Sequence, residues 1–251
     1  IIGKNVKIGP FCYIGPKVQI SDNVELISNV HIEGNTKLGH GTKIFPFASI
    51  GTQPQDLKYK GEANSLEIGE NNIIREYVTI NPGTEGGGGK TVIGKNCLLM
   101  IASHIAHDCN IGNNVVIANN VPLGGHVTIE DSVVIGGNSA VQQFTRIGRL
   151  AMIGGMTGVL KDVIPFGLSF GNRNYLKGLN LIGLRRNKYE NWKNTWFTGP
   201  SLTKFEPTRQ DGVSFLVFKY YFSEENIVLI DKSRALHSHS TEMVKKNLPI
   251  L

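Results

Sequence analysis

The sequence predicts a mainly β fold, a parallel β-helix of six-residue repeats followed by a small, mainly α-helical C-terminal region. The first observation is that an aliphatic residue stands at every sixth position through most of the chain. A period of six fits neither an α-helix nor the alternation of a long strand, and it indicates short strands joined by turns. The second observation is a smaller residue four positions after each aliphatic one, as at Val6, Val18 and Val24. Both positions are expected to face the interior.

The repeats predict one β-helical domain over residues 1–163. Their aliphatic positions form runs of nine, three and twelve, which begin at Ile2, Ile68 and Ile93. The spacing resembles that of hexapeptide-repeat proteins, and this resemblance implies a triangular, left-handed parallel β-helix with three repeats per coil. Residues 18 apart would then lie one above another, and the repeats would make about eight coils spaced roughly 4.8 Å apart.

Two interruptions are expected to leave the helix as loops. The first spans about 51–67, and its length is expected to keep the 18-residue register, with Ile68 above Ile50. The second spans about 81–91 and contains the glycine run 86–89, which indicates a mobile loop that contacts substrate or a neighbouring subunit. Neither a Gly-Lys-Ser/Thr sequence nor a strand–loop–helix pattern accompanies these glycines, so a phosphate-binding P-loop is excluded.

The remaining residues, 164–251, are expected to form the mainly helical C-terminal region. The segment 215–218 is apolar and fits either a helix or a strand. A helix over 174–189 is expected from the spacing of Leu176, Leu179, Leu181 and Leu184.

Composition narrows the classes of function. The net charge of +6 favours anionic partners such as nucleotide phosphates or an acidic carrier protein. No apolar run of about 18 residues or signal peptide is visible, so no membrane span is expected. The chain begins inside the repeat without Met, so its native start is expected upstream. Cys12, Cys97 and Cys109 all fall in the small inward position, which predicts buried free thiols and a reducing cytoplasm.

Three histidines and one carboxylate form the strongest candidate for chemistry. His104 and His107 flank an inward aliphatic residue, and Asp108 follows directly. His126 lies 18 positions after Asp108, so it is expected one coil away at the same edge. Three interpretations fit: polar surface residues at corners, a zinc site like the one gamma-class carbonic anhydrases hold between subunits, or acid–base catalysis by a histidine that Asp108 orients.

Four segments carry a closer resemblance. They read Gln-Asp-Leu-Lys-Tyr at 55–59, His-Ile-Ala-His-Asp-Cys at 104–109, Ala-Asn-Asn at 118–120 and Gly-Gly-His at 124–126. With them the chain resembles the UDP-N-acetylglucosamine acyltransferases of lipid A biosynthesis, in register from Ile1 to about residue 186. The resemblance implies a homotrimer that moves an (R)-3-hydroxyacyl chain from acyl carrier protein to the 3-hydroxyl of UDP-N-acetylglucosamine. It implies active sites between protomers, with no metal, other cofactor or nucleic acid.

The same resemblance implies roles for single residues. His107 would be the general base, Asp108 would orient it, and the Gly125 N–H would face the thioester oxygen as that oxygen gains charge. Met152 and Gly155 would line the acyl-chain groove, with Gly155 leaving its far end open for longer chains. The substrate-binding residues would be Asp56, Lys58, His104, His126, Gln143, Asn180 and Arg186.

Some features depart from the family pattern. Gln142 stands where the family usually has His, and Ile182 stands where it commonly has an acidic residue near the nucleotide. The family's C-terminal helices are not recognisable after about Tyr189, and basic side chains before that point are expected to recognise the carrier protein. A non-enzymatic β-solenoid is the remaining alternative, and it is disfavoured because the repeats carry no flat rank of threonines.

Overall fold

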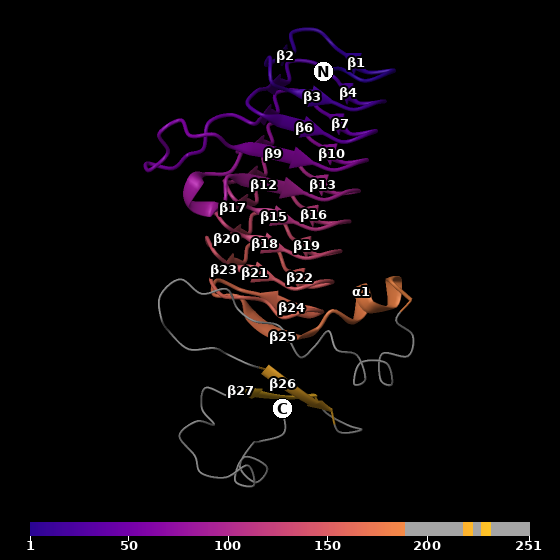
Figure 1. Cartoon of the computed structure of the whole chain (residues 1–251). Coiled ribbons are helices and arrows are strands. Elements are labelled where there is room, and N and C mark those ends of the chain that lie inside the picture. The colour runs from indigo at the N-terminus through magenta and orange to yellow at the C-terminus, as the bar shows by residue number, and fades with distance from the viewer. Residues whose placement is uncertain (189–217, 223–226, 232–251) are drawn as a thin grey trace. The chain divides into compact units, whose positions relative to one another are not determined.

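The structure, a computed structural model, describes residues 1–188, 218–222 and 227–231. The chain divides into two compact units, residues 1–190 and 191–251. The first unit is a stack of coils, which Figure 1 shows from the N-terminal coil downward. In the second unit, β26 (Phe218–Phe222) pairs antiparallel with β27 (Ile227–Asp231). No helix among the described residues is long and apolar enough to cross a bilayer.

The coils of the first unit contribute their short strands in turn to three sheets, called here faces 1, 2 and 3. Face 1 holds β1 (Lys7–Ile8), β4 (Glu25–Leu26), β7 (Lys43–Ile44), β10 (Ile73–Ile74), β13 (Leu98–Leu99), β16 (Val116–Ile117), β19 (Val134–Ile135), β22 (Met152–Ile153), β24 (Gly167–Phe170) and β25 (Tyr175–Leu179). Face 2 holds β2 (Tyr13–Ile14), β5 (His31–Ile32), β8 (Ser49–Ile50), β11 (Thr79–Ile80), β14 (His104–Ile105), β17 (Pro122–Leu123), β20 (Ala140–Val141) and β23 (Gly158–Val159). Face 3 holds β3 (Gln19–Ile20), β6 (Thr36–Leu38), β9 (Ser65–Ile68), β12 (Lys90–Ile93), β15 (Asn110–Ile111), β18 (Thr128–Ile129) and β21 (Arg146–Ile147).

The predicted stacking of residues 18 apart is confirmed for the strand pairs from β1 to β23 that no loop separates, whereas β24 stacks on β22 at a shorter spacing, with Met152 against Leu168. Val116, for example, pairs in parallel with Leu98 on one side and with Val134 on the other. From Ile20 onward the aliphatic residues of the repeats meet along the axis in one continuous buried core, whereas Ile2 and Ile8 of the first coil are exposed. Burial of such side chains is the main stabilising contribution available to a fold whose coils contact only their neighbours. Cys97 and Cys109 are buried free thiols as predicted, and Cys12 is half-buried.

The turns between faces use a left-handed backbone at a recurring position. At the edge between faces 2 and 3, Asp108, His126 and Phe144 have φ values of 59°, 61° and 64°. This conformation costs an ordinary L-residue about 1–2 kcal/mol. Its recurrence at 18-residue spacing shows that coil geometry overrides the local preference, and it stacks these three corner residues one above another.

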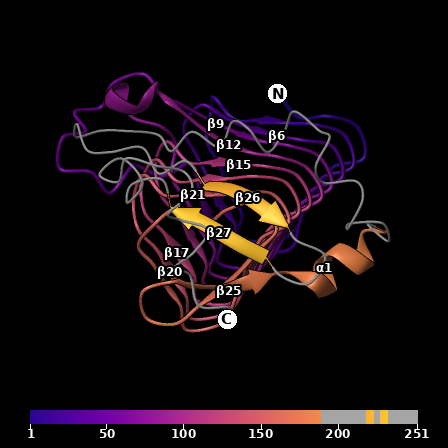
Figure 2. The same ribbon diagram turned by 90° about the horizontal axis from the view of Figure 1, so that it is seen from below.

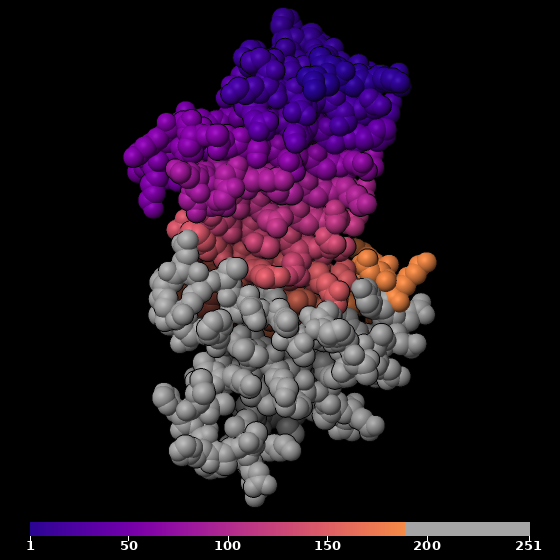
Figure 3. Space-filling model, viewed as in Figure 1, coloured from indigo at the N-terminus to yellow at the C-terminus, as the bar shows by residue number. Residues whose placement is uncertain are grey.

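Both loops leave the helix at this same edge. The first joins β8 to β9, and the second joins β11 to β12 and contains a 3-10 helix, Glu85–Gly87. Figure 3 shows the purple residues of the first loop standing out from the stacked coils. The register expected for the first loop is wrong, because Ile68 pairs with Leu38 on face 3 while Ile50 pairs with Ile80 on face 2. A chain that leaves face 2 must continue on face 3, so the loop enlarges one corner and leaves the order of faces unchanged.

The described end of the first unit differs from the expected helix over 174–189. β24 stacks on β22 as a further rung of face 1, β25 pairs antiparallel with β24, and α1 spans only Leu181–Arg186. The expectation is therefore wrong for 175–179, because the open edge of β24 offers backbone partners that a helix would leave unused. After residue 163 the described residues contain four strands and this one helix, so they are not mainly helical. The expected apolar segment 215–218 lies outside the described residues except for Phe218.

Candidate active site

The candidate site lies at the edge between faces 2 and 3, where the two loops meet the stacked corners. His107 and Asp108 occupy this edge in one coil, and Gly125 and His126 occupy it in the next. The His126 N–H donates to the His107 carbonyl oxygen at 3.0 Å, as stacked coils require. The sequence prediction that 18-residue spacing brings these residues together is therefore confirmed.

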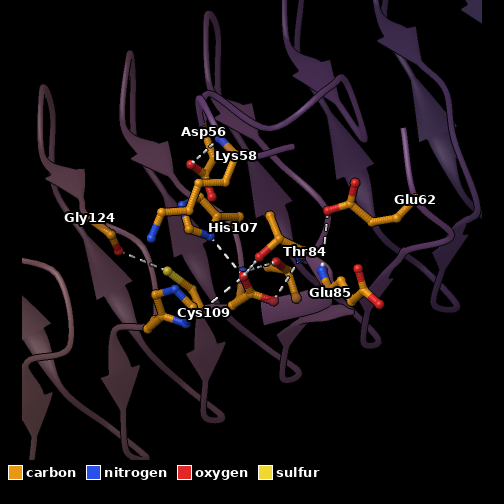
Figure 4. A network of polar contacts seen from close by, with 11 residues as sticks. Asp56, Lys58, Glu62, Thr84, Glu85, His107, Cys109 and Gly124 are labelled. Atoms are coloured by element: carbon orange, nitrogen blue, oxygen red, sulfur yellow. Dashed lines mark hydrogen bonds and ion pairs between the residues drawn. The ribbon is translucent and has the colours of Figure 1, made fainter. Parts of the chain in front are cut away.

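The His107 and Asp108 side chains form a direct pair. Nδ1 of His107 lies 2.8 Å from Oδ2 of Asp108, although the two residues are adjacent in sequence (Figure 4). The Asp108 side chain is 1% exposed and that of His107 is 14% exposed. An ionised carboxylate only accepts hydrogen bonds, so the imidazole donates through Nδ1–H and keeps the lone pair of Nε2 free. This is the arrangement that a general base requires.

Asp108 is held by Thr84 of the second loop and by Thr91 of β12, neither of which the sequence singled out. Its Oδ1 accepts a hydrogen bond from the Thr84 N–H at 2.9 Å, and its Oδ2 accepts one from the Thr84 hydroxyl at 2.6 Å. Its own N–H donates to the hydroxyl oxygen of Thr91 at 2.8 Å. Thr84 lies 24 positions before Asp108, so no short motif joins them; only the length of the loop and the 18-residue stacking could have indicated the contact.

Gly125 faces the ring of His107. A Cβ atom placed on Gly125 would lie 2.6 Å from Cε1 and 2.7 Å from Nε2 of His107, so only glycine fits beside the unmodified ring. Among the described residues, the Gly125 N–H donates to no protein acceptor. A free backbone donor beside a histidine base is the arrangement that stabilises the oxyanion in acyl transfer.

His126 is the second imidazole of the cluster. Its Nδ1 lies 3.9 Å from Oδ2 of Asp108, its ring meets that of His107 edge-on at 5.0 Å, and its other face stacks on Phe144 at 4.4 Å. Burial lowers the pKa of His126 below its usual value, and the neighbouring Asp108 carboxylate partly opposes that effect. Phe144 was not expected at the site, although it lies 18 positions after His126.

His104 lies on face 2 beside the corner. Its Nδ1 is 2.7 Å from the hydroxyl oxygen of Thr79, which occupies the stacked position on β11. Burial lowers the pKa of His104, and the nearby His107 adds to this. His104 is therefore neutral at physiological pH. In this form one ring nitrogen forms a hydrogen bond with the Thr79 hydroxyl, and the other ring nitrogen is available to a ligand.

The first loop brings Asp56 and Lys58 to the same edge. The Lys58 N–H donates to Oδ1 of Asp56 at 2.9 Å, which forms a tight turn at this point of the loop. Both side chains act on His126: the Asp56 charge raises its pKa and the Lys58 charge lowers it. Figure 4 shows the two residues beside His107. The structure thus gathers seven of the expected site residues, Asp56, Lys58, His104, His107, Asp108, Gly125 and His126.

The other expected residues are distributed over other parts of the first unit. Gln143 is exposed at the same edge one coil further on, with its backbone against Gly124. Met152 is on face 1, and Gly155 follows it at the edge between faces 1 and 2. Asn180 caps α1 through Gly183 N and donates to the carbonyl oxygen of Leu150, and Arg186 ends α1. Figure 2, which looks along the stack, shows α1 and the two loops on opposite sides.

The described part of the chain contains one group of side chains that could hold a metal ion. Ligand atoms of His107, Asp108 and His126 all lie within 4.8 Å of one another. Both carboxylate oxygens of Asp108 already accept hydrogen bonds, and Oδ2 accepts from Thr84 and His107 together. Nδ1 of His107 could bind a metal only by giving up its proton and its Asp108 partner, and if Nε2 were the ligand, the Oδ2 atom of Asp108 would remain occupied by the Nδ1–H group. The donor set therefore fits the hydrogen-bonded pair better than it fits a zinc ion.

Two family models match the chain. One describes the bacterial transferase hexapeptide of six repeats and matches residues 90–125. The other describes the second domain of UDP-N-acetylglucosamine O-acyltransferase and matches residues 162–194. Together they include the coil that carries His107 and the end of the first unit.

Curated relatives carry the name acyl-[acyl-carrier-protein]–UDP-N-acetylglucosamine O-acyltransferase. The protein of Aliarcobacter butzleri is 54% identical over 186 residues, which are 74% of this chain and 72% of the relative. The protein of Paracoccus denitrificans is 57% identical over 143 residues, so this chain spans only 55% of that relative's length.

Solved structures agree with these relatives. A UDP-N-acetylglucosamine acyltransferase from Bacteroides fragilis superposes with a TM-score of 0.74 at 44% identity, over 76% of this chain and 74% of that one. The enzyme from Arabidopsis superposes with a TM-score of 0.70 at 38% identity, over 86% of this chain and 82% of that one. The expected left-handed parallel β-helix of hexapeptide repeats is thereby confirmed.

Proposed function

Because the chain belongs to the family of the acyl-[acyl-carrier-protein]–UDP-N-acetylglucosamine O-acyltransferases, we propose that it catalyses their reaction. It transfers an (R)-3-hydroxyacyl chain from acyl carrier protein to the 3-hydroxyl of UDP-N-acetylglucosamine, the first step of lipid A biosynthesis. The observation that carries the proposal is the buried His107–Asp108 pair facing the free N–H of Gly125. The three cysteines of the chain are free thiols, which is compatible with a protein that functions in a reducing cytoplasm.

The pair and the glycine can perform each step of acyl transfer. Nε2 of His107 accepts the proton of the sugar hydroxyl while the hydroxyl oxygen attacks the thioester carbonyl carbon. The new C–O bond pushes an electron pair onto the carbonyl oxygen, where the Gly125 N–H binds it. When the carbonyl re-forms, the C–S bond breaks and the imidazolium returns its proton to the leaving thiolate. Asp108 stabilises the imidazolium between these steps.

The remaining polar residues of the edge hold the acceptor. Asp56 and Lys58 bind the sugar from the first loop, and His104 and His126 bind polar groups on either side of the base. Lowered pKa values keep both of these imidazoles neutral at pH 7, so they can donate and accept hydrogen bonds without repelling the protonated base. Gln143 extends this surface toward the nucleotide.

The distribution of the site residues supports a homotrimer. In a triangular coil, face 1 lies opposite the edge between faces 2 and 3, so one chain cannot place Met152 beside His107. A second copy can bring its own face 1 and α1 to this edge, and with them Met152, Gly155, Asn180 and Arg186. Ile73 on face 1 is 43% exposed, and this apolar side chain suits a contact between copies. Threefold symmetry would then repeat the site three times.

In this proposed homotrimer, the two residues that depart from the family pattern, Gln142 and Ile182, would lie close to the bound nucleotide. Gln142 is an exposed neighbour of Gln143, and its amide replaces an imidazole next to the nucleotide. Ile182 is 65% exposed on α1, so it meets the uridine with an apolar side chain where relatives offer an acid. At the acyl-chain groove, a Cβ on Gly155 would lie only 3.2 Å from the Gly137 carbonyl oxygen, so any side chain there narrows the groove end.

Acyl transfer from a panel of acyl carrier protein thioesters to UDP-N-acetylglucosamine, read by mass spectrometry, tests the proposal. His107→Ala should lower turnover by at least about 100-fold, the usual contribution of a general base. His40→Ala is the matched control, since His40 is exposed in an N-terminal coil. Near-normal turnover by the folded His107→Ala protein would remove His107 as the base.

A zinc-dependent reaction is the second candidate, because His107, Asp108 and His126 could reach one ion. Metal analysis of the purified protein separates the two. Stoichiometric zinc, together with activity that chelators abolish, would favour this alternative. Full acyl transfer after exhaustive chelation would favour metal-free acyl transfer with His107 as the base.

A further inference from the structure

We propose that Thr84 is a positioning residue for the reaction, which directs the Asp108 carboxylate to His107 and away from His126. The inference rests on the proposed acyl transfer, since it concerns the base of that reaction. The two contacts of Thr84 that matter here are both to the Asp108 side chain, so Thr84 acts on His107 through that carboxylate.

The need for such a residue follows from the two imidazoles around one carboxylate oxygen. Oδ2 of Asp108 lies 2.8 Å from Nδ1 of His107 and 3.9 Å from Nδ1 of His126. A carboxylate turns easily about its last bond, because that torsion has broad minima. A small rotation would therefore exchange one imidazole for the other, and the base would lose the partner that fixes its tautomer.

Thr84 opposes this rotation with two hydrogen bonds. Its N–H donates to Oδ1 and its hydroxyl donates to Oδ2, so each carboxylate oxygen has a fixed partner. The Thr84 hydroxyl donates to one lone pair of Oδ2, and His107 donates to the other. Thr84 is 4% exposed and Asp108 is 1% exposed at the side chain, so water cannot easily replace either bond.

The second loop is shaped to deliver Thr84 to this point. The Thr84 carbonyl oxygen accepts from the N–H of Gly87 at 3.0 Å and from that of Gly89 at 2.7 Å, which folds the loop into a tight turn. A Cβ on Gly87 would lie 2.0 Å from Cγ of Asp108, whereas one on Gly86 would meet nothing within 4 Å. The glycine run thus lets the loop backbone rest on the carboxylate.

Asp108 could instead serve only to anchor the loop, and the experiment separates that structural role from positioning. Thr84→Val removes the hydroxyl at nearly constant volume, and Thr84→Ser keeps it. We expect Thr84→Val to lower kcat by about 10-fold to 100-fold with little change in KM for UDP-N-acetylglucosamine, and Thr84→Ser to restore most of kcat. Thr42→Val is the control for loss of a buried hydroxyl, since Thr42 donates to the Gly69 carbonyl oxygen away from the site.

Nitrogen-15 NMR of the histidines, without substrates, gives a readout that a purely structural role would not move. In the wild type the hydrogen-bonded Nδ1–H signal should belong to His107; in Thr84→Val it should weaken or pass to His126. This result would support the positioning role even if acyl transfer were not the reaction, so the two proposals can fail separately. An unchanged His107 signal in folded Thr84→Val, or a Thr84→Ser protein as slow as Thr84→Val, would overturn the inference.

A second pair of variants keeps the test available if Thr84→Val does not fold. Gly87→Ala should displace the Asp108 carboxylate and reproduce the loss of kcat and of the His107 signal, while the adjacent Gly86→Ala should do neither. Equal behaviour of the two alanine variants would count against the proposal.

Discussion

At the scale of single residues, Asp108 is the most constrained group of the site. Its carboxylate accepts three hydrogen bonds and its N–H donates a fourth, all from a left-handed corner position. A buried carboxylate whose two oxygens both accept hydrogen bonds is held in one orientation. The neighbouring imidazole is thereby held in one tautomer before substrate binds, which reduces the reorganisation that the reaction requires.

Gly125 should tolerate no side chain. In Gly125→Ala the new methyl group would lie within 2.7 Å of the His107 ring, so the imidazole must move, and a shift near 1 Å costs about 100-fold in rate. Gly86→Ala is the control, because its methyl group meets open space. Steady-state kinetics of acyl transfer check the prediction. Equal kcat values for the two proteins would contradict the close approach of Gly125 and His107.

Stability should fall on mild acidification, partly through His104. Burial lowers the pKa of this histidine in the folded state from the usual 6.5. Below that value the unfolded chain binds more protons than the folded one, so the contribution of His104 is complete above about pH 6.5 and is lost as pH falls through the folded pKa.

Denaturant unfolding at a series of pH values measures this effect. His104→Gln should reduce the slope of the free energy of unfolding against pH below about pH 6.5. His126 shares the same direction of shift, so part of the slope should remain. His40→Gln, at an exposed position, should leave the slope unchanged, and a His104→Gln slope equal to that of the wild type would contradict the prediction.

At the scale of elements, the two loops work as one unit on the edge between faces 2 and 3. Nδ2 of Asn81, where the second loop begins, donates to the carbonyl oxygens of Thr52 at 3.0 Å and Gln53 at 3.2 Å. Farther along, the Glu62 carboxylate accepts from the N–H groups of Lys60 and Glu85, which joins the loops again. The loop that carries Asp56 and Lys58 is therefore held at both ends.

Replacing Asn81 should loosen the first loop. In Asn81→Asp an ionised carboxylate would face two carbonyl oxygens at a buried position, and a protonated one could donate to only one of them. We expect faster proteolysis or hydrogen exchange within 51–64 and a KM for UDP-N-acetylglucosamine raised several-fold, with a smaller effect on kcat.

Asn114→Asp is the matched control for this variant. Asn114 is exposed at a left-handed corner where Asp is well tolerated, so both readouts should remain at wild-type values. Unchanged exchange within 51–64 in Asn81→Asp would show that the first loop does not depend on this residue.

The sequence predicted the strands of the repeats well, but it predicted poorly the strand and loops whose hydrogen-bond partners are backbone groups. The short strands follow from the six-residue period, because each repeat faces the same interior as the repeat one coil below it. The strand at 175–179 was not predicted, since its leucine spacing also fits a helix and only the open edge of β24 decides between them. The mutual contacts of the loops depend on backbone groups that carry no sequence signal.

At the scale of the whole molecule, the distribution of the proposed site residues has a direct consequence. Figure 2 shows α1 and the two loops on opposite sides of the first unit. Arg186 is the last residue of α1, whereas His107 lies at the edge where the loops leave the helix. If a neighbouring copy supplies Arg186 to each His107, two inactive variants should restore activity when they are mixed.

Mixed trimers of His107→Ala and Arg186→Ala chains test this arrangement. A site is intact when an Arg186→Ala chain supplies His107 and its His107→Ala neighbour supplies Arg186, which occurs at about a quarter of interfaces in a random equal mixture. Reassembly of the two variants should therefore recover roughly a quarter of wild-type turnover. Homotrimers of each variant are the controls. No recovery in verified mixed trimers would mean that both residues of a site come from the same chain.

The sequence by itself determined the repeating coil, its buried core and the juxtaposition of His107, Asp108, Gly125 and His126. Each coil contacts only its neighbours, so a period in sequence becomes a distance in space. Tertiary structure alone decided that Thr84 holds Asp108 and that the chain turns back as β25. These contacts join loops and strand edges whose hydrogen-bond partners are backbone atoms or distant side chains, and such partners are chosen only when the coils have stacked.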